Sequence, residues 1–276
     1  MRTQTLEAEL NIVQEPQLDI LYYPKTGLKP NQEKETLNVL SLFSGCGGMD
    51  LGFEGGFSVL HQSINEGLTP HFIEKKEKKG FIQLKKTKFK TVFANDILTD
   101  ARNAWVNYFS KKGHNSEDFY KESIVDLVKM YRSGVNVFPE EVDVVTGGFP
   151  CQDFSIAGKR NGFNSHKNHK GQLIEKEAPS AETRGQLYMW MKEVIEITQP
   201  KIFIAENVKG LVNLGDVKSI IQNDFSSANG NGYIVLEPQV LHSADFGVPQ
   251  SRERVIFIGI KKSALKKSAL VELEKE

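Results

Sequence analysis

Residues 37–48 read Leu-Asn-Val-Leu-Ser-Leu-Phe-Ser-Gly-Cys-Gly-Gly, an apolar run followed directly by a glycine-rich turn. The run predicts a buried strand over residues 37–43, and the turn predicts entry into a helix over residues 49–53. Glycines at this place let the backbone approach a ligand and direct amide groups at it, as in nucleotide sites of parallel sheets. The signal is weak by itself, because tight strand-to-helix turns also occur without any ligand. No Gly-Lys-Ser/Thr sequence ends the turn, so a nucleoside triphosphate is not expected.

Strands and helices alternate along the rest of the chain. This alternation predicts an α/β fold with a doubly wound, mostly parallel sheet of the Rossmann-like type, with helices on both faces. The further strands are expected over residues 91–95, 141–146, 201–205, 233–241 and 255–260, and the helices over residues 101–109, 185–198 and 212–225.

Four segments differ in composition. Residues 1–36 are predicted to be an N-terminal extension and residues 37–260 the catalytic and cofactor-binding domain, while residues 261–276 form a charged tail with the pattern of a frayed helix. Residues 61–90 are an insertion with eight lysines from Lys75 onward, and a hairpin around Gly80 is one interpretation. A nucleic-acid patch would explain the lysines, but a solvated charged face is the commoner outcome for such a run.

Composition narrows the class of protein. The 276 residues are 39% hydrophobic and 25% charged, which is typical of globular domains, and the formal net charge is zero. Zero net charge argues against a general polyanion binder but leaves a local basic face open. No apolar run has transmembrane length, and the N-terminus lacks a signal-peptide pattern, so we expect no membrane partner.

The two cysteines, Cys46 and Cys151, are too few for a disulfide scaffold. So few cysteines indicate a protein of the reducing cytoplasm. The six histidines show no metal-ligand spacing, so no metal is expected.

Cys151 stands in Gly147-Gly148-Phe149-Pro150-Cys151-Gln152, directly after the strand expected over residues 141–146. Ligands of such sheets bind beyond the carboxyl ends of the strands. A free thiol is mostly protonated at neutral pH, so a nucleophilic Cys151 needs a site that favours the thiolate. A buried structural cysteine is the alternative, but a glycine-proline turn exposes the side chain. Asp96 occupies the corresponding place after the strand over residues 91–95, where a carboxylate can bind ribose hydroxyls.

Six segments between residues 37 and 260 resemble motifs of the cytosine-5 DNA methyltransferases, in the order that the family has them. Any one match could be chance, but the set is specific. The segments are LFSGCGG (42–48, cofactor motif), GFPCQDFS (148–155, nucleophile motif), TRGQL (183–187) and DFGVP (245–249), both intermediate motifs, ENV (206–208, acid motif) and QSRER (250–254, glutamine–arginine–arginine motif).

The resemblance implies a cytosine in double-stranded DNA as substrate, S-adenosylmethionine as cofactor and a flipped-out base. It implies that Cys151 attacks carbon 6, that Glu206 shares a proton with ring nitrogen 3, and that Arg254 hydrogen-bonds the base oxygen. Arg252 would orient the loop or contact phosphate; a surface salt bridge is the alternative for both arginines. The implied cofactor-binding residues are Phe43, Ser44, Gly45, Cys46, Gly47, Gly48, Asp96, Ile97, Pro150 and Leu187.

The chain departs from the family at two places. The family usually has an acidic residue that contacts the adenine amino group, and the matching position here is Ser123, before Ile124, so that contact stays unassigned. Full-length members also carry a target-recognition region after the arginine motif, whereas this chain ends at Glu276.

The ending leaves several hypotheses open. The chain is expected to be one subunit of a split bacterial or phage restriction-modification enzyme, completed by a second polypeptide. The surface around residues 255–260 and the tail over residues 261–276 is then expected to expose apolar area. A truncated module that binds cofactor without turnover, or an RNA cytosine methyltransferase, are the alternatives.

Overall fold

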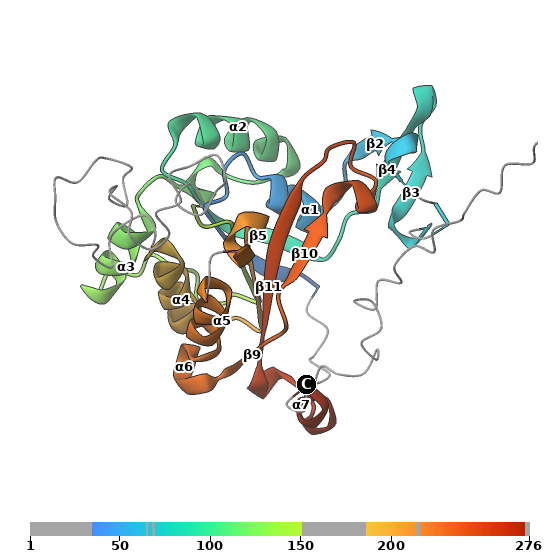
Figure 1. Ribbon diagram of the computed structural model, residues 1–276. Coiled ribbons are helices and arrows are strands. Elements are labelled where there is room, and N and C mark those ends of the chain that lie inside the picture. Colours follow the sequence, from blue (N-terminus) through green and yellow to red (C-terminus); the bar gives the residue numbers. More distant parts are fainter. Residues whose placement is uncertain (1–34, 65, 68–69, 151–185, 214–215, 274–276) are drawn as a thin grey trace, which may run out of the picture.

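The computed structural model describes residues 35–64, 66–67, 70–150, 186–213 and 216–273 (Figure 1). Its main sheet has eight strands in the order β10-β11-β8-β7-β1-β5-β6, with β9 pairing β11 beside this path. The strands are β1 Leu37–Leu42, β5 Phe89–Asn95, β6 Phe119–Tyr120, β7 Val144–Gly147, β8 Ile202–Val208, β9 Tyr233–Val235, β10 Gln239–His242 and β11 Glu253–Lys261.

Five neighbouring strands of the main sheet, β8, β7, β1, β5 and β6, are parallel. β11 runs antiparallel to β8, and β9 and β10 run antiparallel to β11. The chain builds outward from β1 to β5 and β6 on one side, and then from β7 to β8 and β11 on the other. The order therefore reverses beside β1, where ligands of doubly wound sheets bind at the carboxyl edge. The predicted α/β, mostly parallel fold is confirmed.

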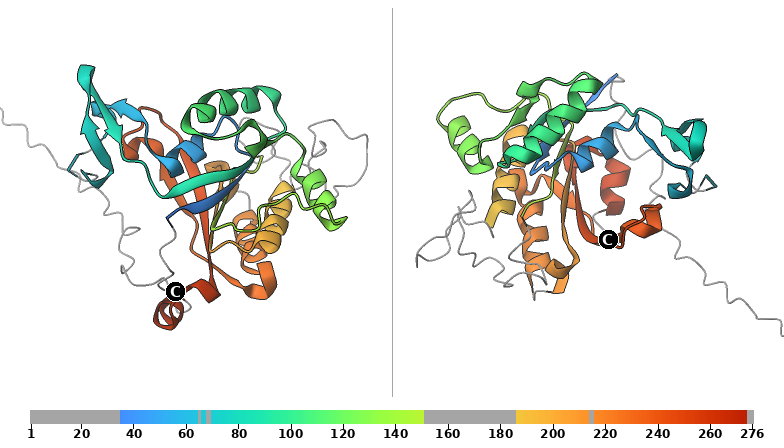
Figure 2. Two further views of the ribbon diagram at one scale, coloured as in Figure 1. Left: turned by 180° about the vertical axis from the view of Figure 1, so that it is seen from behind. Right: turned by 90° about the horizontal axis from the view of Figure 1, so that it is seen from above.

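Helices cover both faces of the sheet (Figures 1 and 2). One buried cluster joins β1, β7 and β8 to α3, α4 and α5, and a smaller one joins β5 and β6 to α2, with Leu51 of α1 packed against it. The helices are α1 Gly48–Glu54, α2 Thr99–Phe109, α3 Ile124–Arg132, α4 Leu187–Thr198, α5 Val217–Ser226, α6 Ala228–Asn231 and α7 Lys267–Leu273.

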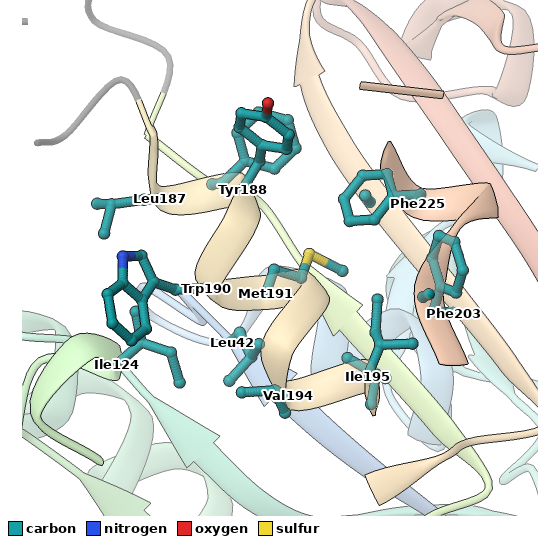
Figure 3. Packing of buried hydrophobic residues seen from close by; sticks show 14 of the residues in the cluster. Leu42, Ile124, Leu187, Tyr188, Trp190, Met191, Val194, Ile195, Phe203 and Phe225 are labelled. Atoms are coloured by element: carbon teal, nitrogen blue, oxygen red, sulfur yellow. The ribbon is translucent and has the colours of Figure 1, made fainter. Parts of the chain in front are cut away.

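The helix expected over residues 185–198 is α4, at the centre of the larger cluster (Figure 3). Its buried residues recur at helical spacing along one face, which explains why it packs so completely against the sheet. They are Leu187, Tyr188, Trp190, Met191, Val194 and Ile195. The helix ends at Gln199 in the left-handed conformation, and Pro200 follows.

Several elements differ from the sequence-based expectation. The single strand expected over residues 233–241 is two strands, β9 and β10, because Pro238 between them cannot donate to a sheet ladder. The helix expected from residue 212 begins at Val217, after a 3-10 turn. β6 and α3 were not expected. The hydroxyl of Ser123 accepts a hydrogen bond from the Val125 amide, so the residue at the departure from the family pattern caps α3.

The lysine-rich segment forms a separate three-stranded sheet with the order β2-β4-β3. Its strands are β2 Ser58–Leu60, β3 Ile73–Lys76 and β4 Phe81–Leu84, and a hairpin with Lys79 and Gly80 at its turn joins β3 to β4. This sheet spans residues 58–84, and residues 89–90 already belong to β5 of the main sheet. The N-terminal extension lies outside the described residues up to residue 34.

Candidate active site

The glycine turn after β1 is held in an unusual conformation. Phe43 has φ of 51°, a left-handed value that bulky residues rarely adopt. Gly45 and Gly47 have φ of 55° and 87°. Hydrogen bonds from both sides fix the turn: the Ser44 amide donates to the Asn95 carbonyl at 2.8 Å, and the Asn95 amide donates to the Ser44 hydroxyl at 3.0 Å. Strain of this kind persists only where the surroundings enforce it, and it concentrates at binding sites.

One side of the turn is closed and the other is open. A Cβ added at Gly47 would lie 2.5 Å from Phe109 and 2.6 Å from Trp105, so α2 packs directly against the turn. A Cβ added at Gly45 or Gly48 would meet no atom within 4 Å. The open side therefore leaves room for a ligand against the backbone.

Asp96 lies at the same turn. Its Oδ2 accepts a hydrogen bond from the Gly45 amide at 3.0 Å, and its Oδ1 accepts one from the Leu98 amide at 2.9 Å. A carboxylate oxygen has more than one lone pair, so both oxygens can also accept from a ligand hydroxyl. Ile97, the next residue in the chain, and Cys46, in the glycine turn, are both exposed. The structure thus brings Asp96 to the glycine turn, as the sequence predicts for a cofactor site.

Asp50 is a buried carboxyl group under the turn to which sequence analysis assigned no role. It stands in the first turn of α1, is fully buried, and accepts a hydrogen bond from the Trp105 indole at 2.7 Å. Burial raises the pKa of Asp50 to about 6, although the hydrogen bonds that its carboxylate accepts oppose the shift. The Asp50–Trp105 contact ties α1 to α2 below the glycine turn.

A second group of residues meets at the carboxyl ends of β7 and β8. Gly148, Phe149 and Pro150 follow β7, and the Asn207 side chain donates to the Phe149 carbonyl at 3.2 Å in a buried position. A Cβ at Gly148 would lie 3.3 Å from Glu206 Oε2, so this backbone passes directly beside that carboxylate. Cys151 follows Pro150 in the sequence and lies outside the described residues.

Glu206 contacts both predicted arginines. Arg254 Nε lies 2.7 Å from Glu206 Oε1, and Arg252 Nη2 lies 3.4 Å from the same oxygen. Strand pairing between β8 and β11 sets this approach, with Arg254 opposite Val208. A salt bridge was the alternative to a direct role of the two arginines at the substrate. The structure contains such a salt bridge, and its acidic partner is Glu206, the predicted catalytic acid. The structure brings Glu206, Arg252 and Arg254 together.

Residues 37–276 match the family model of the C-5 cytosine-specific DNA methylases. The chain belongs to this family. It is 37% identical over 231 residues to the Type II methyltransferase M.BsuRI of Bacillus subtilis, covering 83% of this chain and 44% of that protein. It is 35% identical over 231 residues to M.BspRI of Lysinibacillus sphaericus, covering 83% of this chain and 46% of that protein. The chain thus spans somewhat less than half the length of these relatives.

A solved structure supports the same fold for this member of the family. It belongs to a protein described as a DNA modification methyltransferase encoded within a prophage (E. coli). The alignment has a TM-score of 0.50 and 25% identity, and covers 83% of this chain and 47% of the other. The resemblance read from the six motifs is confirmed at the level of the family.

A hollow of about 440 Å³ opens beside Arg252 and Arg254. It is lined by residues 208–210 and 250–254 together with Asn213, so it joins the end of β8 to the loop before β11. Lys209 and Glu253 form an ion pair of 2.6 Å across it. Arg252 and Arg254 therefore border open space.

Sequence analysis assigned no role to Asn207, although it stands in the quoted ENV motif. Its side chain is fully buried and bonds both the Phe149 carbonyl and, through its own oxygen, the Val208 amide at 2.8 Å. Asn207 therefore links β8 to the backbone that leads to Cys151. The sequence did contain a signal for this role, because a polar side chain within a buried strand needs hydrogen-bond partners.

The remaining predicted cofactor residues border the main core. Phe43 packs against the larger cluster, and Leu187 is buried in the first turn of α4 (Figure 3). Among the described residues, no three histidine, cysteine, aspartate or glutamate side chains gather as a metal site would need. Within the same residues, no helix combines the length and apolar character needed to cross a bilayer.

Proposed function

We propose that this protein methylates cytosine at carbon 5 in duplex DNA, with S-adenosylmethionine as the methyl donor and Cys151 as the nucleophile. The observation that carries the proposal is the contact of Glu206 with Arg254 beside the backbone that leads to Cys151. The family model that matches the chain, that of the C-5 cytosine-specific DNA methylases, supports DNA as the substrate.

Cys151 supplies the step that makes carbon 5 reactive. That carbon is a poor nucleophile within an aromatic ring. Attack of the Cys151 thiolate on carbon 6 forms a carbon–sulfur bond and breaks the aromaticity, so that carbon 5 becomes enamine-like. Once carbon 5 carries the methyl group, it loses its proton, and elimination of the Cys151 thiolate restores the ring.

Glu206 and Arg254 would stabilise the base while it carries charge. A carboxyl group that shares a proton with ring nitrogen 3 relieves the negative charge that the thiolate brings. The Arg254 guanidinium, held by Glu206, adds fixed positive charge and donors for the ring oxygen. Arg252 would position the loop over residues 250–254 or contact a phosphate. Because carbons 5 and 6 are shielded in stacked DNA, the base must be flipped out, at a cost of a few kcal/mol.

The glycine turn fits S-adenosylmethionine, which supplies an electrophilic methyl group on its sulfonium. The open side at Gly45 and Gly48 would admit the cofactor against the backbone, and Asp96 would accept from its ribose hydroxyls. The other residues proposed to border the cofactor are Phe43, Ser44, Cys46, Gly47, Ile97, Pro150 and Leu187.

We also propose that target recognition comes from a second polypeptide that completes the enzyme. The six matched motifs include the cofactor, nucleophile, acid and arginine motifs, and none of the six is assigned to reading the target sequence. Specific DNA recognition commonly buries about 1,000–2,500 Å² of protein surface, and the second polypeptide would supply part of that area.

The test is methyl transfer from labelled S-adenosylmethionine to mixed-sequence duplex DNA, with and without a candidate completing polypeptide, and to transfer RNA in parallel. We expect label in DNA at defined sites only when the polypeptide is added. Sequence-specific methylation by the 276 residues alone would overturn the two-polypeptide proposal, and label confined to RNA would overturn the DNA substrate.

A further inference from the structure

The hairpin of β3 and β4 stands close to the catalytic edge without belonging to it. The 3-10 turn Ser243–Phe246 follows β10 and precedes the arginine loop. Gly247, the next residue, approaches the inserted sheet so closely that an added Cβ would lie 2.2 Å from the Ser63 carbonyl. The insertion is therefore braced against the segment that leads to Arg252 and Arg254.

The tip of this hairpin extends past that segment. Figure 1 and the left view of Figure 2 show the turn between β3 and β4 standing above the turn that joins β10 to β11. Because Glu253, at the start of β11, pairs with His242 near the carboxyl end of β8, this is the catalytic side of the main sheet. DNA placed over the arginines would lie within reach of the hairpin tip.

The tip carries positive charge that the protein does not neutralise. Lys75, Lys78 and Lys79 are exposed, and none of them forms an ion pair with any residue in the described ranges. Residues 74–79 contain four lysines and two glutamates, so the hairpin has an excess of positive charge even with Glu74 exposed beside Lys75. Another nearby carboxylate, Glu66, binds Lys76 at 2.9 Å and His61 at 2.6 Å.

Glu77, the acidic residue at the start of the turn, accepts from the Ser58 hydroxyl at 2.9 Å. The formal net charge of the whole chain is zero, so the excess at the tip is local.

The backbone at the tip is also unusual. Lys79 has φ of 62°, in the left-handed region, where turns normally place glycine or asparagine. Gly80 follows with φ of 77°. A long cationic side chain at a position that favours small residues is an outlier of the kind that marks functional sites.

We propose that this hairpin binds the phosphate backbone of duplex DNA beside the flipped cytosine. The inference rests on the proposed function and adds a contact surface to it. Lysines bind phosphates as point charges without reading sequence, so the hairpin would add affinity and orientation but no target specificity. Lys78 and Lys79 at the tip would each neutralise one phosphate.

The chain offers a matched control for the test. Lys88 and Lys90 are exposed and unpaired among the described residues, but they lie at the start of β5, where Phe89 pairs with Leu37 at the amino end of β1. That end is opposite the catalytic edge. The double variant Lys78→Gln/Lys79→Gln therefore removes two positive charges from the hairpin tip. The double variant Lys88→Gln/Lys90→Gln removes two positive charges from the opposite end of the main sheet.

The experiment measures binding of the full chain to a fluorescent 30-base-pair duplex by anisotropy at several salt concentrations. Each phosphate contact contributes about 0.9 to the slope of log affinity against log salt, so the hairpin variant should lose about 1.5–2 in slope. Its affinity should fall about tenfold at low salt, while the control variant keeps the slope of the unaltered chain. Cofactor binding and melting temperature should not change in either variant, because the side chains are exposed.

Three outcomes would overturn the proposal in distinguishable ways. If the unaltered chain binds the duplex and both variants bind it with the same affinity and slope, the hairpin has no role and the proposed function stands. If both variants lose affinity equally, the effect is one of net charge and the hairpin proposal fails. If the unaltered chain binds transfer RNA and no duplex at all, the hairpin proposal and the DNA substrate fail together.

Discussion

Arg254 Nε lies 2.7 Å from Glu206 Oε1, and this contact joins β11 to β8 at the carboxyl edge of the sheet. Both side chains are largely shielded, with 25% and 20% of their surface exposed, whereas Arg252 is 47% exposed and 3.4 Å from the same oxygen. The two arginines of one motif are therefore unequal: Arg254 is held in the site, and Arg252 stands at its rim.

The first prediction follows from this inequality. Arg254→Lys should lower the rate of methyl transfer by about 100- to 1,000-fold, the usual effect of removing one preorganised donor from a developing charge. Arg252→Lys should lower it less than about tenfold, because rim contacts contribute little. Single-turnover transfer on the completed enzyme measures both, and equal losses would contradict the assignment of Arg254 to the base.

The second prediction concerns Asn207. Asn207→Ala leaves the buried Phe149 carbonyl without its donor, which should cost about 1–3 kcal/mol of unfolding free energy. The backbone before Cys151 should also lose its position, so the transfer rate should fall while cofactor affinity is kept. Urea unfolding and calorimetry check this. The control Asn223→Ala, at an exposed position of α5, should change stability by less than about 0.5 kcal/mol.

The third prediction concerns the cofactor. Asp96→Ala should weaken binding of S-adenosylmethionine by roughly 1–3 kcal/mol, because ligand hydroxyls and the Gly45 amide lose their acceptor. Asp100→Ala, which removes an exposed carboxylate four residues along the chain, is the control and should leave affinity unchanged. Isothermal calorimetry that finds equal affinities for the two variants would exclude Asp96 from the site.

The fourth prediction is a pH dependence of stability caused by Asp50. Its pKa is about 6 in the folded protein and 3.8 when unfolded. A raised pKa favours folding while the group is protonated, so this contribution is complete below pH 3.8 and is lost as the pH rises through 6. The loss amounts to about 3 kcal/mol.

Asp50→Asn keeps an oxygen acceptor for the Trp105 indole and removes the titration. It should therefore be more stable than the unaltered chain at pH 8 and no more stable at pH 4. Urea unfolding at the two pH values measures the difference. A stability difference that does not depend on pH would show that Asp50 is not the titrating group.

Local patterns predicted much of the site. The glycine turn, Asp96, the strand that ends at Gly147 and the strand that carries Glu206 follow from short apolar runs and the residues beside them. Parallel strands end at one edge of a sheet, so residues after different strands meet there. The position of Asp96 near Gly45 could therefore be predicted from the sequence, although the hydrogen bond between the two residues could not.

Features that depend on distant contacts were not predictable. The expectation of exposed apolar area is wrong for residues 255–260, because Val255 and Phe257 are fully buried between paired strands and α5. In the tail, which the same expectation included, Val271 is exposed. Instead Val240, Phe246 and Val248 are exposed on β10 and the following turn. Likewise, nothing in the sequence around Asp50 reveals that Trp105 covers it, since the two residues meet only when α1 and α2 pack together.

The central claim is that Cys151 attacks the base, and covalent trapping tests it most directly. Duplex DNA containing 5-fluorocytosine blocks loss of the carbon 5 proton, so a covalent enzyme–DNA adduct should accumulate with S-adenosylmethionine and the completing polypeptide. Cys151→Ser should abolish the adduct and leave cofactor binding intact. An adduct of equal yield in Cys151→Ser would contradict the account and indicate Cys46, the other cysteine of the chain, as the nucleophile.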